Sequence, residues 1–225
     1  MAPKNSSFKI ILGSSSMARR KILADMGYEF TVMTADIDEK SIRKENAEEL
    51  VVALAEAKCI WQDIVLLSHR NHPMKARTNP RNCSSHSVNY CRHNLFGYIL
   101  PTSIGIEVAV YQGIIREKPS SKEEARHFIK SYSGGQATVV GSVVVTNLTK
   151  GIRKGAWERS EVYFHDIPDE VIDSLIEEGI ILNVAGGLML EHPLTLPFVD
   201  TLIGTADSVM GLPRSLTEKL IEEAL

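Results

Sequence analysis

Short apolar runs alternate with amphipathic stretches along most of this chain, which is the pattern of an α/β protein. The apolar runs predict strands at residues 8–12, 29–34, 106–111, 137–148 and 161–165. The amphipathic stretches predict helices at residues 17–26, 47–60, 120–132 and 168–178, and a last helix that begins at a capping box at residues 215–218. We therefore expect an α/β fold in which a single domain, residues 1–225, has a twisted mixed β-sheet flanked by helices.

The pattern fails between about residues 63 and 104, where neither a helical nor a strand period is maintained. We expect this atypical segment to be poorly ordered. It also contains residues that bind zinc in other proteins, although their spacing matches no closed structural site. These are Cys83, His86, Cys91 and His93, with His69 and His72 nearby. A zinc site and an interaction surface for another protein remain alternatives for this segment.

The overall composition narrows the class of protein. Hydrophobic residues make up 44% of the chain and charged residues 24%, which is ordinary for a globular protein. We expect no membrane partner, because no apolar run reaches the length of a membrane span and the start of the chain lacks a signal peptide. The three cysteines are too few for a disulfide framework, so a cytoplasmic location is expected. A net charge of −3 argues against nucleic-acid binding.

Hydroxyl and cationic side chains gather where the first predicted strand meets the first predicted helix. Ser14, Ser15 and Ser16 fill the turn, and Arg19 and Arg20 follow on the helix. A helix N-terminus offers free backbone N–H groups to an anion, and guanidinium groups match phosphate oxygens. The turn is therefore a candidate phosphate site, although serine is also common at helix starts as an ordinary cap.

Other charged positions are weaker candidates when each is taken alone. The acidic turn at residues 36–39 could bind a divalent cation, and Lys58, Lys118 and Glu191 could lie in ordinary solvated positions. Their combination is more informative. Two lysines, two arginines and a carboxylate-bound cation would neutralise the charge of a polyphosphate chain.

The order of these motifs resembles that of the Maf family of nucleoside triphosphate pyrophosphatases. The resemblance rests on six short motifs in sequence: Leu12-Gly13-Ser14-Ser15-Ser16-Met17-Ala18-Arg19-Arg20, Asp36-Ile37-Asp38-Glu39, Leu54-Ala55-Glu56-Ala57-Lys58, Glu117-Lys118-Pro119, Tyr132-Ser133-Gly134 and Gly211-Leu212-Pro213. It covers nearly the whole chain apart from the atypical segment. The run Val184-Ala185-Gly186-Gly187 together with Glu191 is closer to the branch associated with 7-methyl-GTP than to the branch acting on dTTP and UTP.

The resemblance implies a reaction and a set of site residues. The reaction is hydrolysis between the α and β phosphates of a nucleoside triphosphate, giving a nucleoside monophosphate and pyrophosphate, with Mg²⁺ or Mn²⁺ as cofactor. Phosphate would be held by Ser14, Ser16, Arg19 and Arg20, and the metal by Glu39. Lys58 and Lys118 would neutralise the triphosphate, and Glu191 would lie near the base or the reacting phosphate. A homodimer and a Maf-like fold are also implied.

The chain departs from the family at one important position. The family carries an aspartate at the start of the strand that leads to the Lys-Pro motif, and counting back from Lys118 places Ile106 there. Isoleucine can neither accept a proton nor bind a metal. Glu107 is the adjacent candidate, but successive side chains of a strand face opposite sides, so we expect it to replace the aspartate only through a register slip or bulge. A nucleotide-binding protein with impaired catalysis is therefore the alternative function.

Overall fold

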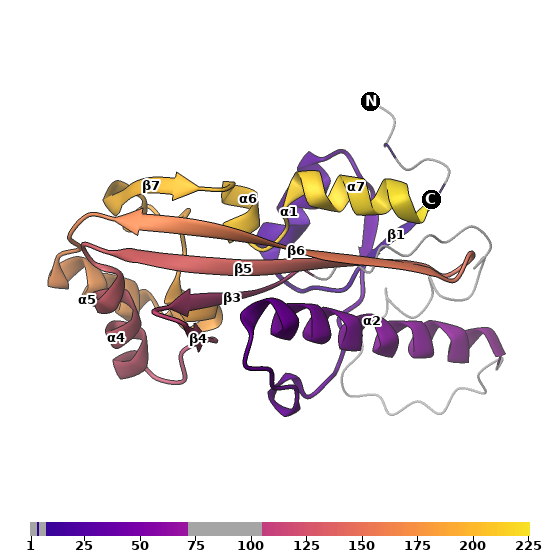
Figure 1. Ribbon diagram of the computed structural model, residues 1–225, viewed down its shortest axis with the longest axis horizontal. Helices are drawn as coiled ribbons and strands as arrows, with labels where there is room; N and C mark the ends of the chain where they lie inside the picture. The colour runs from indigo at the N-terminus through magenta and orange to yellow at the C-terminus, as the bar shows by residue number, and fades with distance from the viewer. Residues whose placement is uncertain (1–3, 5–7, 72–104) are drawn as a thin grey trace.

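An antiparallel sheet of five strands forms the centre of the molecule, and its longest strands extend across the whole structure (Figure 1). The computed structural model describes residues 4, 8–71 and 105–225. The strand order is β4-β3-β5-β6-β7. The strands are β3 (Ile106–Tyr111), β4 (Ile114–Arg116), β5 (Gln136–Asn147), β6 (Ile152–Phe164) and β7 (Val199–Ile203). The uncharged run predicted as a strand at residues 137–148 is thus β5, with neighbours on both sides.

A second, smaller sheet contains the only parallel pairing in the part of the chain that the structure describes. It consists of β1 (Ile10–Leu12) and β2 (Phe30–Val32), joined by helix α1 (Met17–Asp25). The expected α/β fold with a sheet flanked by helices is confirmed. The parallel and antiparallel pairings lie in two separate sheets. The strands β1 and β2 pack against α1 and the C-terminal helix, and they do not extend the edge of the large sheet.

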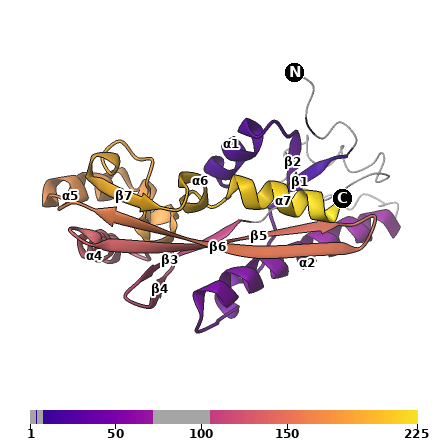
Figure 2. The ribbon, with the colours of Figure 1, turned by 45° about the horizontal axis from the view of Figure 1, so that its top comes forward.

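Helices cover both faces of the long β5–β6 hairpin (Figure 2). Helix α2 (Ala47–Asn71) packs through Leu54 and its neighbours onto Val140 and Val144 of β5. On the opposite face, α1 and α7 (Arg214–Ala224) pack onto Val143 and Val145. The alternation of side chains along a strand therefore distributes one apolar run between two cores. The remaining helices are α4 (Lys122–Tyr132), α5 (Asp169–Glu178) and the short α6 (Ala206–Val209).

A third core lies at the other end of the sheet. There α4 and α5 pack with the end of β6 and with a run of short 3₁₀ segments. These segments are η2 (Ile180–Asn183), η3 (Ala185–Gly187) and η4 (Leu196–Phe198), and η1 (Glu39–Ser41) precedes α2. The apolar stretch after α5 thus forms turns and not a long regular element, because Gly186 and Gly187 both take positive φ angles.

Three local expectations were wrong. The strand expected only at residues 161–165 is β6, which already begins at Ile152 and ends at Phe164. The helix expected to end near residue 60 continues to Asn71, because Gln62 is fully buried and Asp63 pairs with Arg153 of β6. The last helix begins at Arg214 with Pro213 as its N-cap, so Ser215 lies inside the helix and does not cap it as expected. The zinc alternative falls outside the described residues except for His69. None of the helices in the described ranges has both the length and the apolar character needed to cross a membrane.

Candidate active site at the N-terminus of helix α1

The serine-rich turn lies between β1 and α1, as the sequence predicts. Ser16 caps the helix, because its side chain accepts the backbone N–H of Arg19 at 3.5 Å. The hydroxyl of Ser14 accepts the N–H of Ser16 at 3.2 Å and so closes the turn. These two hydroxyls order the loop, which leaves its other amide groups and the positive end of the helix available to an anion.

Arg19 is the central cation of the site, and it is only 7% exposed. One terminal nitrogen donates to the hydroxyl of Ser14 at 2.8 Å, and the other forms an ion pair with Glu107. Its Nε is buried and has no hydrogen-bond partner among the described residues. Burial lowers the pKa of Arg19 to about 10, and the charge of Glu39 opposes this shift. A desolvated guanidinium would interact strongly with a phosphate oxygen that displaced one of the present partners of its terminal nitrogens.

Glu107 reaches Arg19 because β3 is regular at this point. β3 pairs with β5 in continuous register from Ile106 to Val110, so Glu107 lies on the face of the sheet that carries α1. The register slip or bulge that we expected to be necessary for this placement is therefore absent from β3. Ile106 points to the opposite face, where it is buried against α2.

Gly211 makes room for the ion pair between Arg19 and Glu107. Its φ angle is +90°, and a side chain at this position would collide with the carboxylate of Glu107 and lie 2.9 Å from Nε of Arg19. A side chain at Gly105 would likewise collide with the backbone oxygen of Gly211. Sequence reasoning noted the Gly211-Leu212-Pro213 motif but did not assign it a role. The structure shows that its glycine allows β3 and α1 to approach closely.

Lys58 and Glu39 form the second charged pair of the site. Nζ of Lys58 lies 2.8 Å from Oε1 of Glu39. Burial lowers the pKa of Lys58, the pairing with Glu39 opposes this change, and the positive charges of Arg19 and Lys118 contribute a further lowering. Arg19 and Lys118 are thus close enough for their charges to act on Lys58, which places the three cations in one region.

Lys118 is exposed, and its segment is fixed by the residue before it. The carboxylate of Glu117 pairs with Arg43 at 3.2 Å, and Arg43 also donates to the backbone oxygen of Glu39 at 3.3 Å. The backbone oxygen of Glu117 accepts the N–H of Gly186 at 2.8 Å. The Lys-Pro motif is thus connected both to the Glu39 turn and to the segment that precedes Glu191.

Glu191 belongs to a small pocket of about 60 Å³. Ser16 and Glu107 line the same pocket, together with apolar side chains of β3, β5 and α6. The structure therefore brings the serine turn, Glu107 and Glu191 together. Arg20 is half-buried beside Arg19, and its Nε has no hydrogen-bond partner among the described residues.

No cluster of three or more metal-binding side chains was found within the described ranges. Two carboxylates, Glu39 and Glu107, lie in the cationic region, and each is already paired with a cation. Mg²⁺ in nucleotide sites commonly needs one or two carboxylates together with phosphate oxygens and water. The donor set therefore fits a cation that arrives with a nucleotide, and not a cage formed by the protein alone.

Comparisons with known proteins identify the family of this chain. The sequence model of the family described as Maf-like protein matches residues 9–224. A 7-methyl-GTP pyrophosphatase of Dictyostelium discoideum is 33% identical, over 95% of this chain and 96% of the relative. A dTTP/UTP pyrophosphatase of Fusobacterium nucleatum is 28% identical, over 92% and 90%. A nucleoside triphosphate pyrophosphatase of Salinispora tropica is 26% identical, over 96% and 83%. The family match extends from residue 9 to residue 224, from the start of β1 to the last helix, so the chain belongs to the Maf family.

Proposed function

We propose that this protein is a nucleoside triphosphate pyrophosphatase, which hydrolyses the bond between the α and β phosphates. The observation that carries the proposal is Arg19, which is buried at the start of α1, bonded to Ser14 and paired with Glu107 beside the Glu191 pocket. Membership of the Maf family and the names of the relatives support the same reaction. The products are a nucleoside monophosphate and pyrophosphate.

The nucleotide that we propose as substrate is 7-methyl-GTP. The relative named for that nucleotide is 33% identical to this chain, and the Fusobacterium nucleatum relative named for dTTP and UTP is 28% identical. The Val184–Gly187 run and Glu191 support the same choice, because they resemble the corresponding branch of the family. Glu191 lines a pocket with Met189 and Leu188, so an acceptor oxygen and apolar atoms are available there to a base.

The chemical step requires a water molecule to attack the α phosphorus while the bond to the departing pyrophosphate breaks. A base must accept the proton of that water. Glu107 is paired with Arg19 in the free protein, and a phosphate oxygen would compete with it for the same guanidinium. We propose that nucleotide binding releases the carboxylate of Glu107, which then accepts the proton. Arg19, Arg20, Lys58 and Lys118 stabilise the negative charge that develops on the phosphates.

Mg²⁺ or Mn²⁺ is the cofactor that we propose, with Glu39 as its protein ligand. When bound, the cation would offset the charge of the triphosphate and orient its oxygens. Glu39 is exposed enough to accept such a cation and lies beside Lys58. We also propose a cytoplasmic homodimer, on the basis of the cysteine usage and of the family resemblance.

The proposal is tested by measuring pyrophosphate release from 7-methyl-GTP, dTTP and UTP in the presence of Mg²⁺ or Mn²⁺. We expect turnover that depends on the divalent cation, with the highest kcat/KM for 7-methyl-GTP. Absence of pyrophosphate release from all three nucleotides would refute the proposed activity. A preference for dTTP or UTP would refute only the proposed substrate.

Replacing Glu107 by glutamine tests its assigned role. Glu107→Gln should lower kcat by about 10²–10⁴-fold, because an amide cannot accept the proton. Nucleotide affinity should remain equal or increase severalfold, since the competing charge on Arg19 is removed. The matched control is Glu161→Gln on β6, where the carboxylate accepts from Tyr163 at 2.9 Å outside the site. An unchanged kcat in Glu107→Gln would show that another group is the base.

A further inference from the structure

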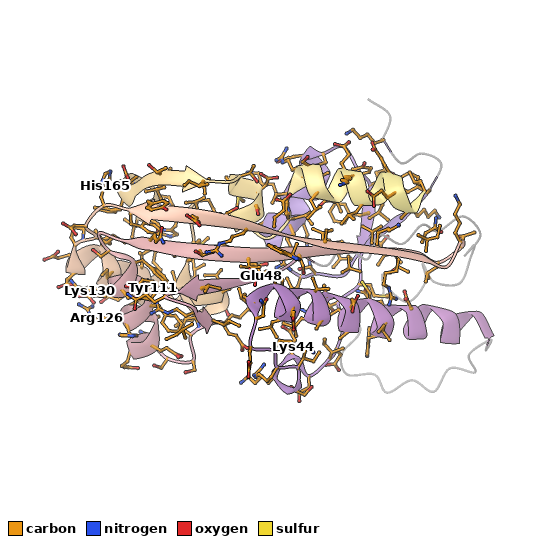
Figure 3. The ribbon with its side chains drawn as sticks, viewed as in Figure 1. Lys44, Glu48, Tyr111, Arg126, Lys130 and His165 are labelled. Carbon is orange, nitrogen blue, oxygen red and sulfur yellow. The ribbon has the colours of Figure 1, made fainter. Side chains whose placement is uncertain are left out.

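A buried arginine outside the phosphate site forms the centre of an aromatic cluster. Arg116 of β4 is 6% exposed, and its guanidinium carbon lies 4.4 Å from the ring centre of Tyr111, 4.6 Å from that of Phe128 and 5.0 Å from that of Tyr132. It donates to the hydroxyl of Ser131 at 2.6 Å. No carboxylate within the described ranges forms an ion pair with Arg116. Figure 3 shows Tyr111 at the end of β3 beside α4, the helix that carries Phe128 and Tyr132.

Tyr132 connects this cluster to the turn that precedes Glu191. The tyrosine is 1% exposed, and its hydroxyl donates to the backbone oxygen of Gly186 at 3.0 Å. Burial raises the pKa of Tyr132, and the charge of Arg116 opposes that shift. The hydroxyl therefore keeps its proton at neutral pH and remains a donor.

Gly186 is held from both sides. Its oxygen accepts from Tyr132, and its N–H donates to the oxygen of Glu117 at 2.8 Å. Glu117 stands between Arg116 and Lys118 in the chain. Arg116 and its aromatic neighbours are thus linked through Gly186 to two segments. One segment contains Lys118, and the other leads to Glu191.

We infer that Arg116 and Tyr132 are positioning residues, which set the separation between the Lys118 segment and the Glu191 pocket. The proposal rests on the proposed function, because it assigns to Lys118 and Glu191 the two ends of one nucleotide. The arginine holds the tyrosine ring through its π face, and the tyrosine hydroxyl holds Gly186. Neither side chain needs to touch the substrate.

The first test uses hydrogen exchange and requires no nucleotide. In Tyr132→Phe the ring is retained and only the hydroxyl is lost, so the fold should persist. Amide exchange in a peptide covering residues 184–191 should accelerate by about tenfold, which corresponds to the loss of one buried hydrogen bond. Tyr163→Phe on β6 is the matched control and should leave this peptide unchanged. Unchanged exchange in Tyr132→Phe would refute the connection.

The second test uses a double-mutant cycle with Glu191→Gln. The measured quantity is the Kd for an α,β-methylene analogue of 7-methyl-GTP, which cannot be hydrolysed at that bond. We expect Tyr132→Phe to weaken binding about tenfold in the wild-type background and less than twofold in Glu191→Gln, because the tyrosine acts through the Glu191 segment. If Tyr132→Phe weakened binding of the analogue by the same factor in both backgrounds, the inference would be refuted. Arg116→Lys, which keeps the charge but not the planar stacking, should retain part of the affinity that Arg116→Met loses.

The outcomes separate this inference from the proposed function. A wild-type protein that releases no pyrophosphate from any nucleotide would refute the function, whatever the exchange data show. A wild-type protein that turns over substrate but gives no coupling between Tyr132 and Glu191 would refute only the positioning role.

Discussion

At the scale of single residues, the site depends on charged groups that have lost part of their water. Arg19 is buried and Lys58 is partly buried, and burial lowers the pKa of each. The charge of Arg19 is partly neutralised by Glu107, and that of Lys58 by Glu39. A partly compensated cation costs free energy in the unliganded protein, and a phosphate oxygen recovers some of that cost. The affinity of the site for a nucleotide therefore depends on whether Arg19 and Lys58 are protonated.

Nucleotide affinity should decrease as the pH rises through the alkaline range. The pKa of Lys58 is lowered below its ordinary value of 10.5, so its ammonium loses the proton earlier than that of a solvated lysine. The measurement is the Kd of the α,β-methylene analogue as a function of pH. Lys58→Met should bind about tenfold more weakly at pH 7 and should show a smaller alkaline decrease, because the remaining decrease comes from Arg19, whose pKa is about 10. The control Lys154→Met, at an exposed position on β6, should behave like wild type.

Ile106→Asp should destabilise the protein and should not increase its activity. The isoleucine is 6% exposed and packs against α2, so the new carboxylate would be buried in an apolar core. We expect a loss of about 4 kcal/mol in the free energy of unfolding at pH 7, against about 1 kcal/mol for Ile106→Val. Urea denaturation measures both. A variant that is stable and turns over nucleotide much faster than wild type would show that Ile106, and not Glu107, occupies the place of the catalytic carboxylate.

At the scale of elements, the site is held by turns and by the ends of strands. The turn η3 is fixed by two hydrogen bonds of Gly186 and by contact with β3. A side chain at Gly186 would collide with that of Ala109 and lie 2.8 Å from the hydroxyl of Tyr132. The positive φ angle of +61° adds strain for any residue other than glycine. This turn is therefore more sensitive to substitution than an open turn of the same backbone conformation.

Gly186→Ala should cost about 3 kcal/mol of stability, because it combines a positive φ with overpacking. The matched control is Gly113→Ala in the β3–β4 hairpin, where φ is +80° and no atom lies within 4 Å of the added carbon. The control should lose only about 1 kcal/mol from backbone strain. Chemical denaturation of both variants gives the comparison, and equal losses would contradict the packing of η3 against β3.

Most elements could be predicted from the sequence, including the three-residue strands β1 and β2, but the long elements α2 and β6 were predicted only in part. The β3 strand matches its predicted bounds, and α1, α4, α5 and β5 match within a residue or two. The strands β4 and β7 and the short helix α6 were missed. β4 has three residues, and β7 has exposed positions at Asp200, Thr201 and Ile203, so neither shows a clear period. Pairing with a longer neighbour, and not local pattern, makes them strands.

At the scale of the whole molecule, the site lies where two groups of elements meet on the central sheet. One group contains the small parallel sheet, α1, α2 and α7, and the other contains α4, α5 and the 3₁₀ turns (Figure 1). Arg19 comes from the first group, Glu191 from the second and Glu107 from β3 between them. Residues 19 and 107 are far apart in sequence, and their approach needs the glycine at position 211 from a third segment.

The sequence by itself determined the alternation of helices and strands, the position of the serine turn between the first strand and the first helix, and the resemblance to the Maf family. Those properties depend on local periodicity and on residue types at short spacing, which can be read along the chain. Only the tertiary structure decided that Glu107 faces Arg19 while Ile106 faces α2, because the two faces of β3 acquire their neighbours through pairing with β5. The tertiary structure alone also brought Tyr132, with Arg116 beside it, into contact with the turn that precedes Glu191. A contact between residues 132 and 186 leaves no periodic signal in the sequence.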